Sequence, residues 1–201
     1  MTVDALGRAR PRLPFLSFFA LAALFVGPVL THEAVFGSSV GLIAAGSGVA
    51  VGLLIAAAST RWSWDTLSTL AALLVAYFLL GGPIALPSTV RWGVVPTTDT
   101  LLTLVRGSVS SWKDLLTLTP PAASYVGPAL VPWITGLLCA LISGLVSVRW
   151  GRPLLGVIPV AAMGVVGLAF GLSGVVPPVW PFMVWFAGAF LWLAWASSHQ
   201  R

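Results

Sequence analysis

Long stretches of the chain hold no charged residue and no histidine, and short segments that carry the charges separate them. These stretches are 14–31, 34–60, 66–90, 115–148 and 153–198. A helix rises about 1.5 Å per residue, so about 20 apolar residues cross the roughly 30 Å hydrocarbon core of a bilayer. Each stretch is therefore long enough for at least one membrane-spanning helix.

The apolar runs are continuous rather than alternating, which favours helices over the strands of a membrane barrel. A helix satisfies its own backbone polar groups, as lipid requires. The last stretch is long enough for two spans, and Gly174, Pro177 and Pro178 divide it. We predict an all-α, polytopic bundle in a single membrane domain over residues 1–201, with six spans at 14–31, 38–58, 67–86, 126–148, 153–172 and 178–197.

The longest segment between predicted spans, the external loop 87–125, has a helical pattern of its own. Apolar residues recur three or four positions apart, and Pro120 and Pro121 follow them. This pattern predicts an amphipathic helix over about 98–118, capped by Thr98 or Asp99 and lying along the outer leaflet. It either packs on the bundle or receives an external domain, and its candidate interfacial or docking residues are Leu101, Val105, Trp112, Lys113 and Leu116.

Composition agrees with a chain embedded in lipid, and the basic residues predict its orientation. Hydrophobic residues make up 58% of the sequence and charged residues 7%, against about 25% charged in ordinary soluble domains. One side of the predicted spans holds Arg8, Arg10, Arg12, Arg61, Arg149, Arg152 and Arg201, and the other holds Arg91, Arg106 and Lys113. Because cytoplasmic segments are rich in Lys and Arg, we expect a multi-pass protein of the cell membrane with both ends of this chain in the cytoplasm. Topology thus explains the basic excess, and no nucleic-acid partner is expected.

Pairs of glycines four residues apart mark candidate helix-packing positions. Such pairs let helices approach closely in lipid, where packing depends on van der Waals contact. The candidates are Gly37 and Gly41, Gly48 and Gly52, and Gly167 and Gly171. We expect them to pack helices of the same chain, with dimerisation as the alternative.

Candidate catalytic and metal-binding groups are few. We expect the adjacent His32 and Glu33 to form a solvated pair in a short external loop. No charged residue or histidine then lies deep in a predicted span, which argues against a coupled transporter because such proteins bind an ion or proton at a buried charge. Cys139 lies in an apolar run, away from both histidines. We predict no catalytic residue, no metal site and no cofactor.

The predicted loop helix also carries a resemblance to a known family. The run LVRGSVSSWKDLLTLTPP, from Leu104 to Pro121, resembles the external loop in the N-terminal membrane domain of actinobacterial transglutaminase-like proteins of the TgpA type. In that family a hydrophobic multi-helix region precedes an extracytoplasmic transglutaminase-like domain. The order of the spans fits as well, so the resemblance extends to nearly the whole chain. The Cys/His/Asp catalytic domain of the family has no counterpart here, so no catalytic residue is carried over.

The resemblance implies a non-enzymatic integral membrane domain of the cell envelope. Such a domain would anchor or scaffold an extracytoplasmic transglutaminase-like domain or another envelope partner, in contact with membrane lipids and other membrane proteins. The alternative is a small transporter or channel, because six spans interrupted by Gly and Pro also occur in such proteins. An intramembrane enzyme would need convergent polar groups that the sequence does not show.

Overall fold

The computed structural model describes residues 14–93, 95–117, 125 and 127–171, with 183, 185, 187–189 and 192. Its helices are α1 (Pro14–Phe36), α2 (Ser39–Arg61), α3 (Thr66–Ala85), α4 (Thr98–Thr117), α5 (Leu130–Gly144) and α6 (Pro153–Gly171). A short 3-10 helix, η1 (Pro87–Thr89), follows α3, and a π-helical turn, η3 (Leu145–Arg149), continues α5. The described part of the chain contains no β-strand. The predicted all-helical class is therefore confirmed for these residues.

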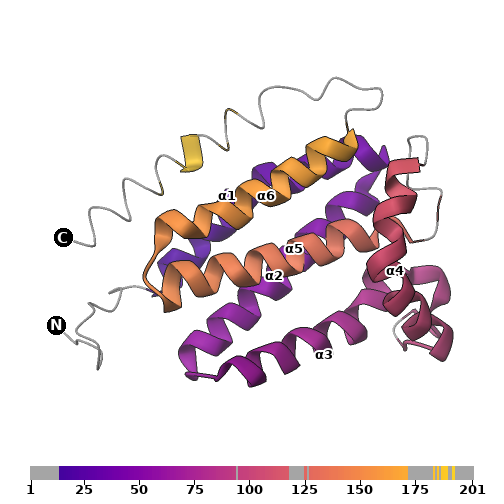
Figure 1. Cartoon of the computed structure of the whole chain (residues 1–201), viewed down its shortest axis with the longest axis horizontal. Coiled ribbons are helices and arrows are strands. Elements are labelled where there is room, and N and C mark those ends of the chain that lie inside the picture. The colour runs from indigo at the N-terminus through magenta and orange to yellow at the C-terminus, as the bar shows by residue number, and fades with distance from the viewer. Residues whose placement is uncertain are drawn as a thin grey trace.

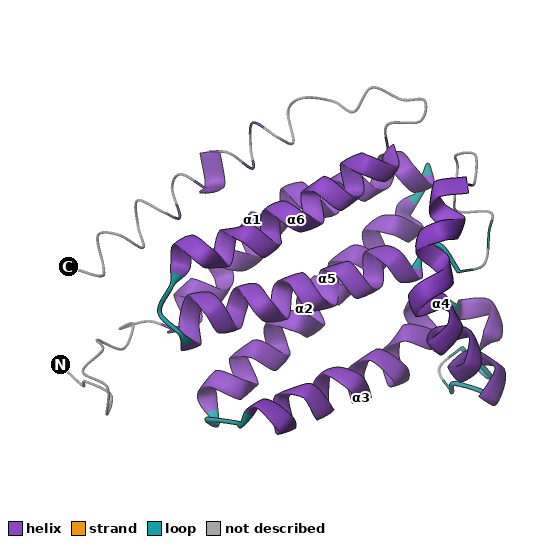
Figure 2. Ribbon diagram, viewed as in Figure 1, coloured by secondary structure: helices purple, strands orange, loops and turns teal. Residues whose placement is uncertain are grey.

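The helices other than α4 run side by side in an up-and-down bundle, and α4 lies across one end of it (Figure 1). Short turns connect α1 to α2, α2 to α3 and η3 to α6, as the teal segments in Figure 2 show. The most extensive packing joins α2 to α5, and α1 and α6 pack against each other and against this pair. The α2–α5 pair is therefore the centre of the bundle.

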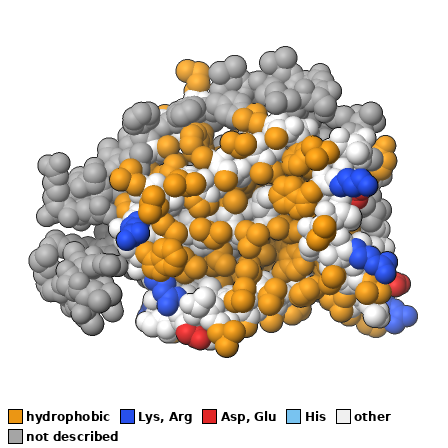
Figure 3. Space-filling view, viewed as in Figure 1, with side chains coloured by type: hydrophobic (Ala, Val, Ile, Leu, Met, Phe, Trp, Pro, Cys, Tyr) orange, Lys and Arg blue, Asp and Glu red, His pale blue; other side chains and the backbone are white. Residues whose placement is uncertain are grey.

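Four described helices are long and apolar enough to cross a membrane. They are Ser39–Arg61, Thr66–Ala85, Leu130–Arg149 and Pro153–Phe170, and the apolar segment Ser17–Glu33 lies within α1. Large apolar side chains on the outside of the bundle are exposed, such as Leu54 at 67% and Leu67 at 73%. Hydrophobic side chains also cover the middle of the face drawn in Figure 3, while charged ones lie toward its two ends. This distribution is compatible with a protein that lipid surrounds.

The first helix is longer than the sequence pattern predicts. The expected span ended at residue 31, with His32 and Glu33 in a solvated loop, but α1 continues to Phe36. The helix ends at Gly37, which has a φ of +60° and donates its N–H to the Glu33 carbonyl over 2.8 Å. A left-handed glycine just after the last turn is a common way to end a helix. The loop assignment of His32 and Glu33 is therefore wrong.

The remaining bounds differ from the predicted spans by a few residues, except at the C-terminal end. There, the predicted span 178–197 lies almost wholly outside the described residues. The described positions within it are Met183, Trp185, 187–189 and Trp192, and each is helical. Gly188 lies near Leu24 of α1, whose Cδ2 would be 3.6 Å from a Cβ at this glycine.

Candidate functional site

The start of α4 is held by a cluster of threonines. The backbone N–H of Thr100 donates to the Thr97 hydroxyl over 3.2 Å, and the N–H of Thr97 donates to the Thr100 hydroxyl over 3.1 Å. This reciprocal arrangement resembles a capping box. The Thr100 hydroxyl also donates to the carbonyl of Thr89 over 2.7 Å. Thr97 therefore caps α4 instead of the expected Thr98 or Asp99, because it precedes the first helical residue and reaches the free N–H of the first turn.

Helix α4 is tied to α3 by a tyrosine. The Tyr77 hydroxyl lies 2.9 Å from the Leu104 carbonyl and 2.8 Å from the Ser108 hydroxyl. The Leu104 side chain is fully buried, and its Cδ2 would lie only 2.9 Å from a Cβ at Gly81. The end of α3 thus provides both a polar contact and the space into which α4 fits.

Helix α4 also reaches α5 and α6. Gly107 lies so close to Leu130, the first residue of α5, that a Cβ at position 107 would overlap the leucine side chain. Farther along, the rings of Trp112 and Phe170 lie 6.2 Å apart. Helix α4 thereby joins the ends of α3, α5 and α6 at one end of the bundle.

Three faces run along α4. The inner face is buried and consists of Thr100, Leu104, Gly107, Ser111 and Leu115. Successive residues turn by about 100° in a helix, which places two exposed flanks on either side of the inner face. The apolar flank is Leu101, Leu102, Val105, Val109 and Leu116, and the polar flank is Asp99, Arg106, Ser110, Lys113 and Asp114. The helix therefore has one surface that packs on the bundle, one exposed apolar surface and one exposed polar surface.

The five candidate docking residues divide among these surfaces. Leu101, Val105 and Leu116 lie on the apolar flank, and Lys113 lies on the polar flank. Trp112 is half-buried against Phe170. The spacing in the sequence placed these residues on one helix, but their division into separate surfaces depends on where α3, α5 and α6 pack.

Two of the candidate glycines lie where α2 meets α5. A Cβ at Gly48 would lie 2.6 Å from the Trp133 carbonyl oxygen, and one at Gly52 would lie 2.5 Å from the Leu137 carbonyl oxygen. From the opposite side, a Cβ at Gly136 of α5 would lie 2.6 Å from the carbonyl oxygen of Ala45. The two backbones are in direct contact along this line. Gly136 was missed in the sequence because the residues four positions away from it, Pro132 and Ala140, are not glycines.

The other candidate glycines have different surroundings. Gly37 lies in the turn before α2, and Gly41 faces the Phe36 ring and the His32 carbonyl at the corner between α1 and α2. Gly167 of α6 lies against Thr31 and His32 of α1. Gly171 is the last residue of α6. The glycine pairs therefore serve separate contacts rather than one common helix face.

His32 is buried between α1 and α6, with 2% of its surface exposed. Its Nδ1 lies 3.0 Å from the Pro28 carbonyl oxygen, which accepts a hydrogen bond if that nitrogen carries the proton. A Cβ at Gly167 would lie 3.1 Å from the His32 Cε1. Among the described residues, Nε2 has no hydrogen-bond partner. A buried polar atom without a partner is unusual, and this one was not foreseen because α6 is far away in the sequence.

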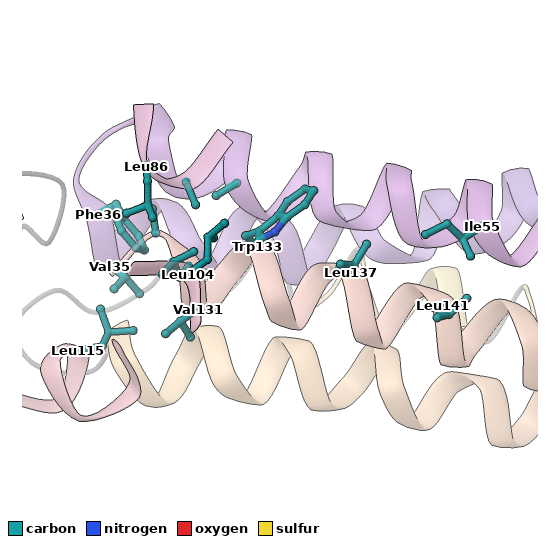
Figure 4. Close-up of a cluster of buried hydrophobic side chains, with 14 of the residues drawn as sticks. Val35, Phe36, Ile55, Leu86, Leu104, Leu115, Val131, Trp133, Leu137 and Leu141 are labelled. Atoms are coloured by element: carbon teal, nitrogen blue, oxygen red, sulfur yellow. The ribbon is translucent and has the colours of Figure 1, made fainter. Parts of the chain in front are cut away.

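Trp133 of α5 is another buried residue that the sequence pattern did not single out. It is 0% exposed in the cluster that also contains Leu104 and Leu137 (Figure 4). Its Nε1 would be 3.1 Å from a Cβ at Gly81 of α3. The glycine therefore makes room for the indole where α3, α4 and α5 meet.

The residues described above pack helices together or lie on exposed surfaces of α4. Within the described ranges, no three His, Cys, Asp or Glu residues come together in a way that would hold a metal ion. Cys139 is a half-buried free thiol on α5. No family model, no curated protein and no solved structure matches this chain.

Proposed function

We propose that this chain is a non-enzymatic, multi-pass membrane domain that holds a transglutaminase-like domain, or another envelope partner, at the outer face of the cell membrane. In this proposal the chain crosses the membrane six times with both of its ends in the cytoplasm. Helix α4 lies in the outer interface and provides the contact with the partner.

The three-faced structure of α4 is the observation that carries the proposal. A helix in a membrane interface turns an apolar surface toward the acyl chains and a polar surface toward water. Helix α4 has both, together with a third face that Tyr77, Leu130 and Phe170 hold against the bundle. An external domain that contacts the polar flank would thus be fixed relative to three helices rather than to a flexible loop.

Site-specific photo-crosslinking in cells tests this role. A photoreactive amino acid at Lys113, on the polar flank, should form an adduct with an extracytoplasmic protein that carries a transglutaminase-like domain or with another envelope protein. Ser63, in the exposed turn between α2 and α3, is the matched control position at the other end of the bundle. Adducts with cytoplasmic proteins at Lys113, or the same products from both positions, would overturn the proposal.

A small transporter is the second candidate function, and His32 is the observation that favours it. An ionisable side chain buried between helices of a membrane protein is a candidate ion or proton site. His32 lies on α1, which contains Pro28, and faces α6, which contains Pro159. Helices with internal prolines are common around such sites.

Proton flux distinguishes the second candidate from the first. The full chain is reconstituted into liposomes that contain a trapped pH-sensitive dye, and a potential is applied. A transporter that uses His32 would acidify the liposomes faster than empty ones, and His32→Gln would abolish the difference while Ser63→Ala would preserve it. Equal rates with and without protein would exclude proton transport.

A further inference from the structure

The two ends of the bundle carry different charges. At the end where α2 meets α3 and η3 meets α6, the described residues include three arginines and one carboxylate: Arg61, Arg149, Arg152 and Asp65. At the opposite end, three basic residues accompany three carboxylates: Arg91, Arg106, Lys113, Glu33, Asp99 and Asp114. The first end, here called the arginine end, therefore has an excess of positive charge.

One arginine at this end is held in place by a chain of hydroxyl groups. Nη1 of Arg149 donates to the Ser59 hydroxyl over 2.9 Å. Ser59 is fully buried, and its oxygen lies 2.9 Å from the Thr69 hydroxyl. Since Thr69 donates its own proton to the Asp65 carbonyl over 2.9 Å, Ser59 must donate to Thr69 and accept from Arg149. The direction of each hydrogen bond from Arg149 through Ser59 and Thr69 to the Asp65 carbonyl is thereby determined.

This arrangement fixes the guanidinium without neutralising it. The two hydroxyl groups and the Asp65 carbonyl in this series are uncharged. Ser59 is the single hydrogen-bond partner of the Arg149 side chain among the described residues. The guanidinium has five N–H donors in a planar fork. Arg149 is exposed, so the rest of the fork is available to an anion.

The surroundings of Arg149 indicate which anion fits. Trp62 and Trp150 lie at the same end and are 65% and 55% exposed. Exposed tryptophans at the ends of membrane spans are typical of the headgroup layer. A guanidinium fork pairs well with the oxygens of a phosphate group, and basic residues at the cytoplasmic ends of spans bind anionic lipids.

We propose that Arg149 binds the phosphodiester headgroup of an anionic phospholipid, with Arg61 and Arg152 adding to the attraction. Ser59 and Thr69 act as positioning residues, since they orient the guanidinium without contacting the lipid. The π-helical turn of η3 ends at Arg149, and such turns are frequent at functional sites. The inference rests on the membrane placement of the proposed function but not on any partner at α4.

Lipid titration of the purified full chain in an uncharged detergent tests the site. The midpoint of thermal unfolding is followed while phosphatidylglycerol, phosphatidylcholine or inorganic phosphate is added. Phosphatidylglycerol should raise the midpoint, and the other two should raise it much less. In Arg149→Gln, the phosphatidylglycerol concentration for half the effect should rise about tenfold, as expected for the loss of one bond to a charged group.

Further variants separate this site from a general effect of charge. Arg106→Gln, which removes an exposed charge at the opposite end, should leave the titration unchanged. Ser59→Ala should weaken the effect of phosphatidylglycerol by about threefold, because Arg149 keeps its charge but loses its orientation. Arg149→Lys should also weaken the effect of phosphatidylglycerol, because an ammonium lacks the planar fork. This variant replaces Arg149→Gln in the test if the Gln variant does not fold.

Three results would overturn the proposal: an equal effect of phosphatidylcholine, an equal effect of free phosphate, or an equal loss in Arg149→Gln and Arg106→Gln. None of these results would change the adducts expected at Lys113. The lipid titration can therefore overturn the lipid site without overturning the anchoring role, and the crosslinking can do the reverse.

Discussion

The Tyr77 hydroxyl of α3 lies 2.9 Å from the carbonyl oxygen of Leu104 in α4. The Ser108 hydroxyl donates to the same oxygen over 2.7 Å, so two side-chain hydroxyl groups meet at this carbonyl. The contact is the polar link between a candidate membrane span and the helix that crosses the end of the bundle.

We expect Tyr77→Phe to loosen α4 without unfolding the bundle. The loss of one hydrogen bond costs about 1 kcal/mol, which corresponds to an increase of about fivefold in the opening of α4. Hydrogen exchange of the amides in 98–117, followed by mass spectrometry, measures this opening. Tyr125→Phe is the matched control, since Tyr125 is exposed, and equal exchange in the two variants would contradict the role of Tyr77.

Substitution of the glycines between α2 and α5 should destabilise the bundle. In Gly48→Ala the new methyl group would meet the Trp133 carbonyl oxygen at 2.6 Å, and overpacking of this kind costs about 1–3 kcal/mol. Gly46→Ala is the matched control on the same helix, because the nearest atom would be 3.9 Å away. The control should be neutral or more stable, since Ala favours a helix by up to about 1 kcal/mol over Gly. Thermal unfolding in detergent compares the two variants, and equal midpoints would rule out the close contact of α2 with α5 at Gly48.

The indole of Trp133 should matter for its volume rather than for its N–H group. Trp133→Ala should cost about 3–5 kcal/mol because it leaves a large cavity. Trp133→Phe should cost much less, because Nε1 has no hydrogen-bond partner among the described residues and its removal breaks no such bond. Equal losses of stability in the two variants would contradict this reasoning.

The acid stability of the bundle should depend in part on Asp65, which caps α3. Its Oδ1 accepts the Ser68 N–H over 3.1 Å, and hydrogen bonds from the side chain and backbone of Ser68 hold the pKa of this carboxyl below its ordinary value of 3.8. A carboxyl with a lowered pKa contributes stability above its unfolded pKa and loses it as the pH falls through the folded value.

Asp65→Asn tests this contribution, because asparagine retains the cap but does not titrate. The variant should lose less of its unfolding midpoint than the unmodified chain when the pH falls below about 4. An identical decline in the two proteins would show that the charge of Asp65 does not contribute.

Reporter fusions test the predicted orientation. A reporter that is active only outside the cytoplasm should be active after Pro96 and inactive after Ser63, because the arginine end carries the positive excess. The reverse pattern would invert the topology and place α4 in the cytoplasm.

Within the described residues, the sequence pattern predicted most helix bounds to within a few residues, because each long apolar run determines its own helix. It failed where the outcome depends on contacts between distant segments. The end of α1 depends on Gly37 rather than on the polar pair His32 and Glu33. The burial of His32 depends on the absence of a side chain at Gly167, which lies on another helix. No periodicity within α1 contains that information.

The candidate surface on α4 shows the same limit. Spacing alone groups Leu101 and Leu104 on one apolar side, yet Leu104 is fully buried and Leu101 is exposed. The difference arises from Tyr77 and Gly81 of α3, which determine the rotation of α4. A prediction of the docking surface therefore requires the packing of the bundle.

The backbone contact between α2 and α5 restricts how this protein can change shape. Gly48 and Gly136 leave no side chains between the two helices at these points, so no change of rotamer can let one helix slide or rotate past the other. Any alternate conformation must move α1, α3 or α6 as rigid bodies around a fixed central pair. The packing of α3 against α2 and α5 is less extensive than the packing between α1 and α6, so opening would cost less at the boundary of α3.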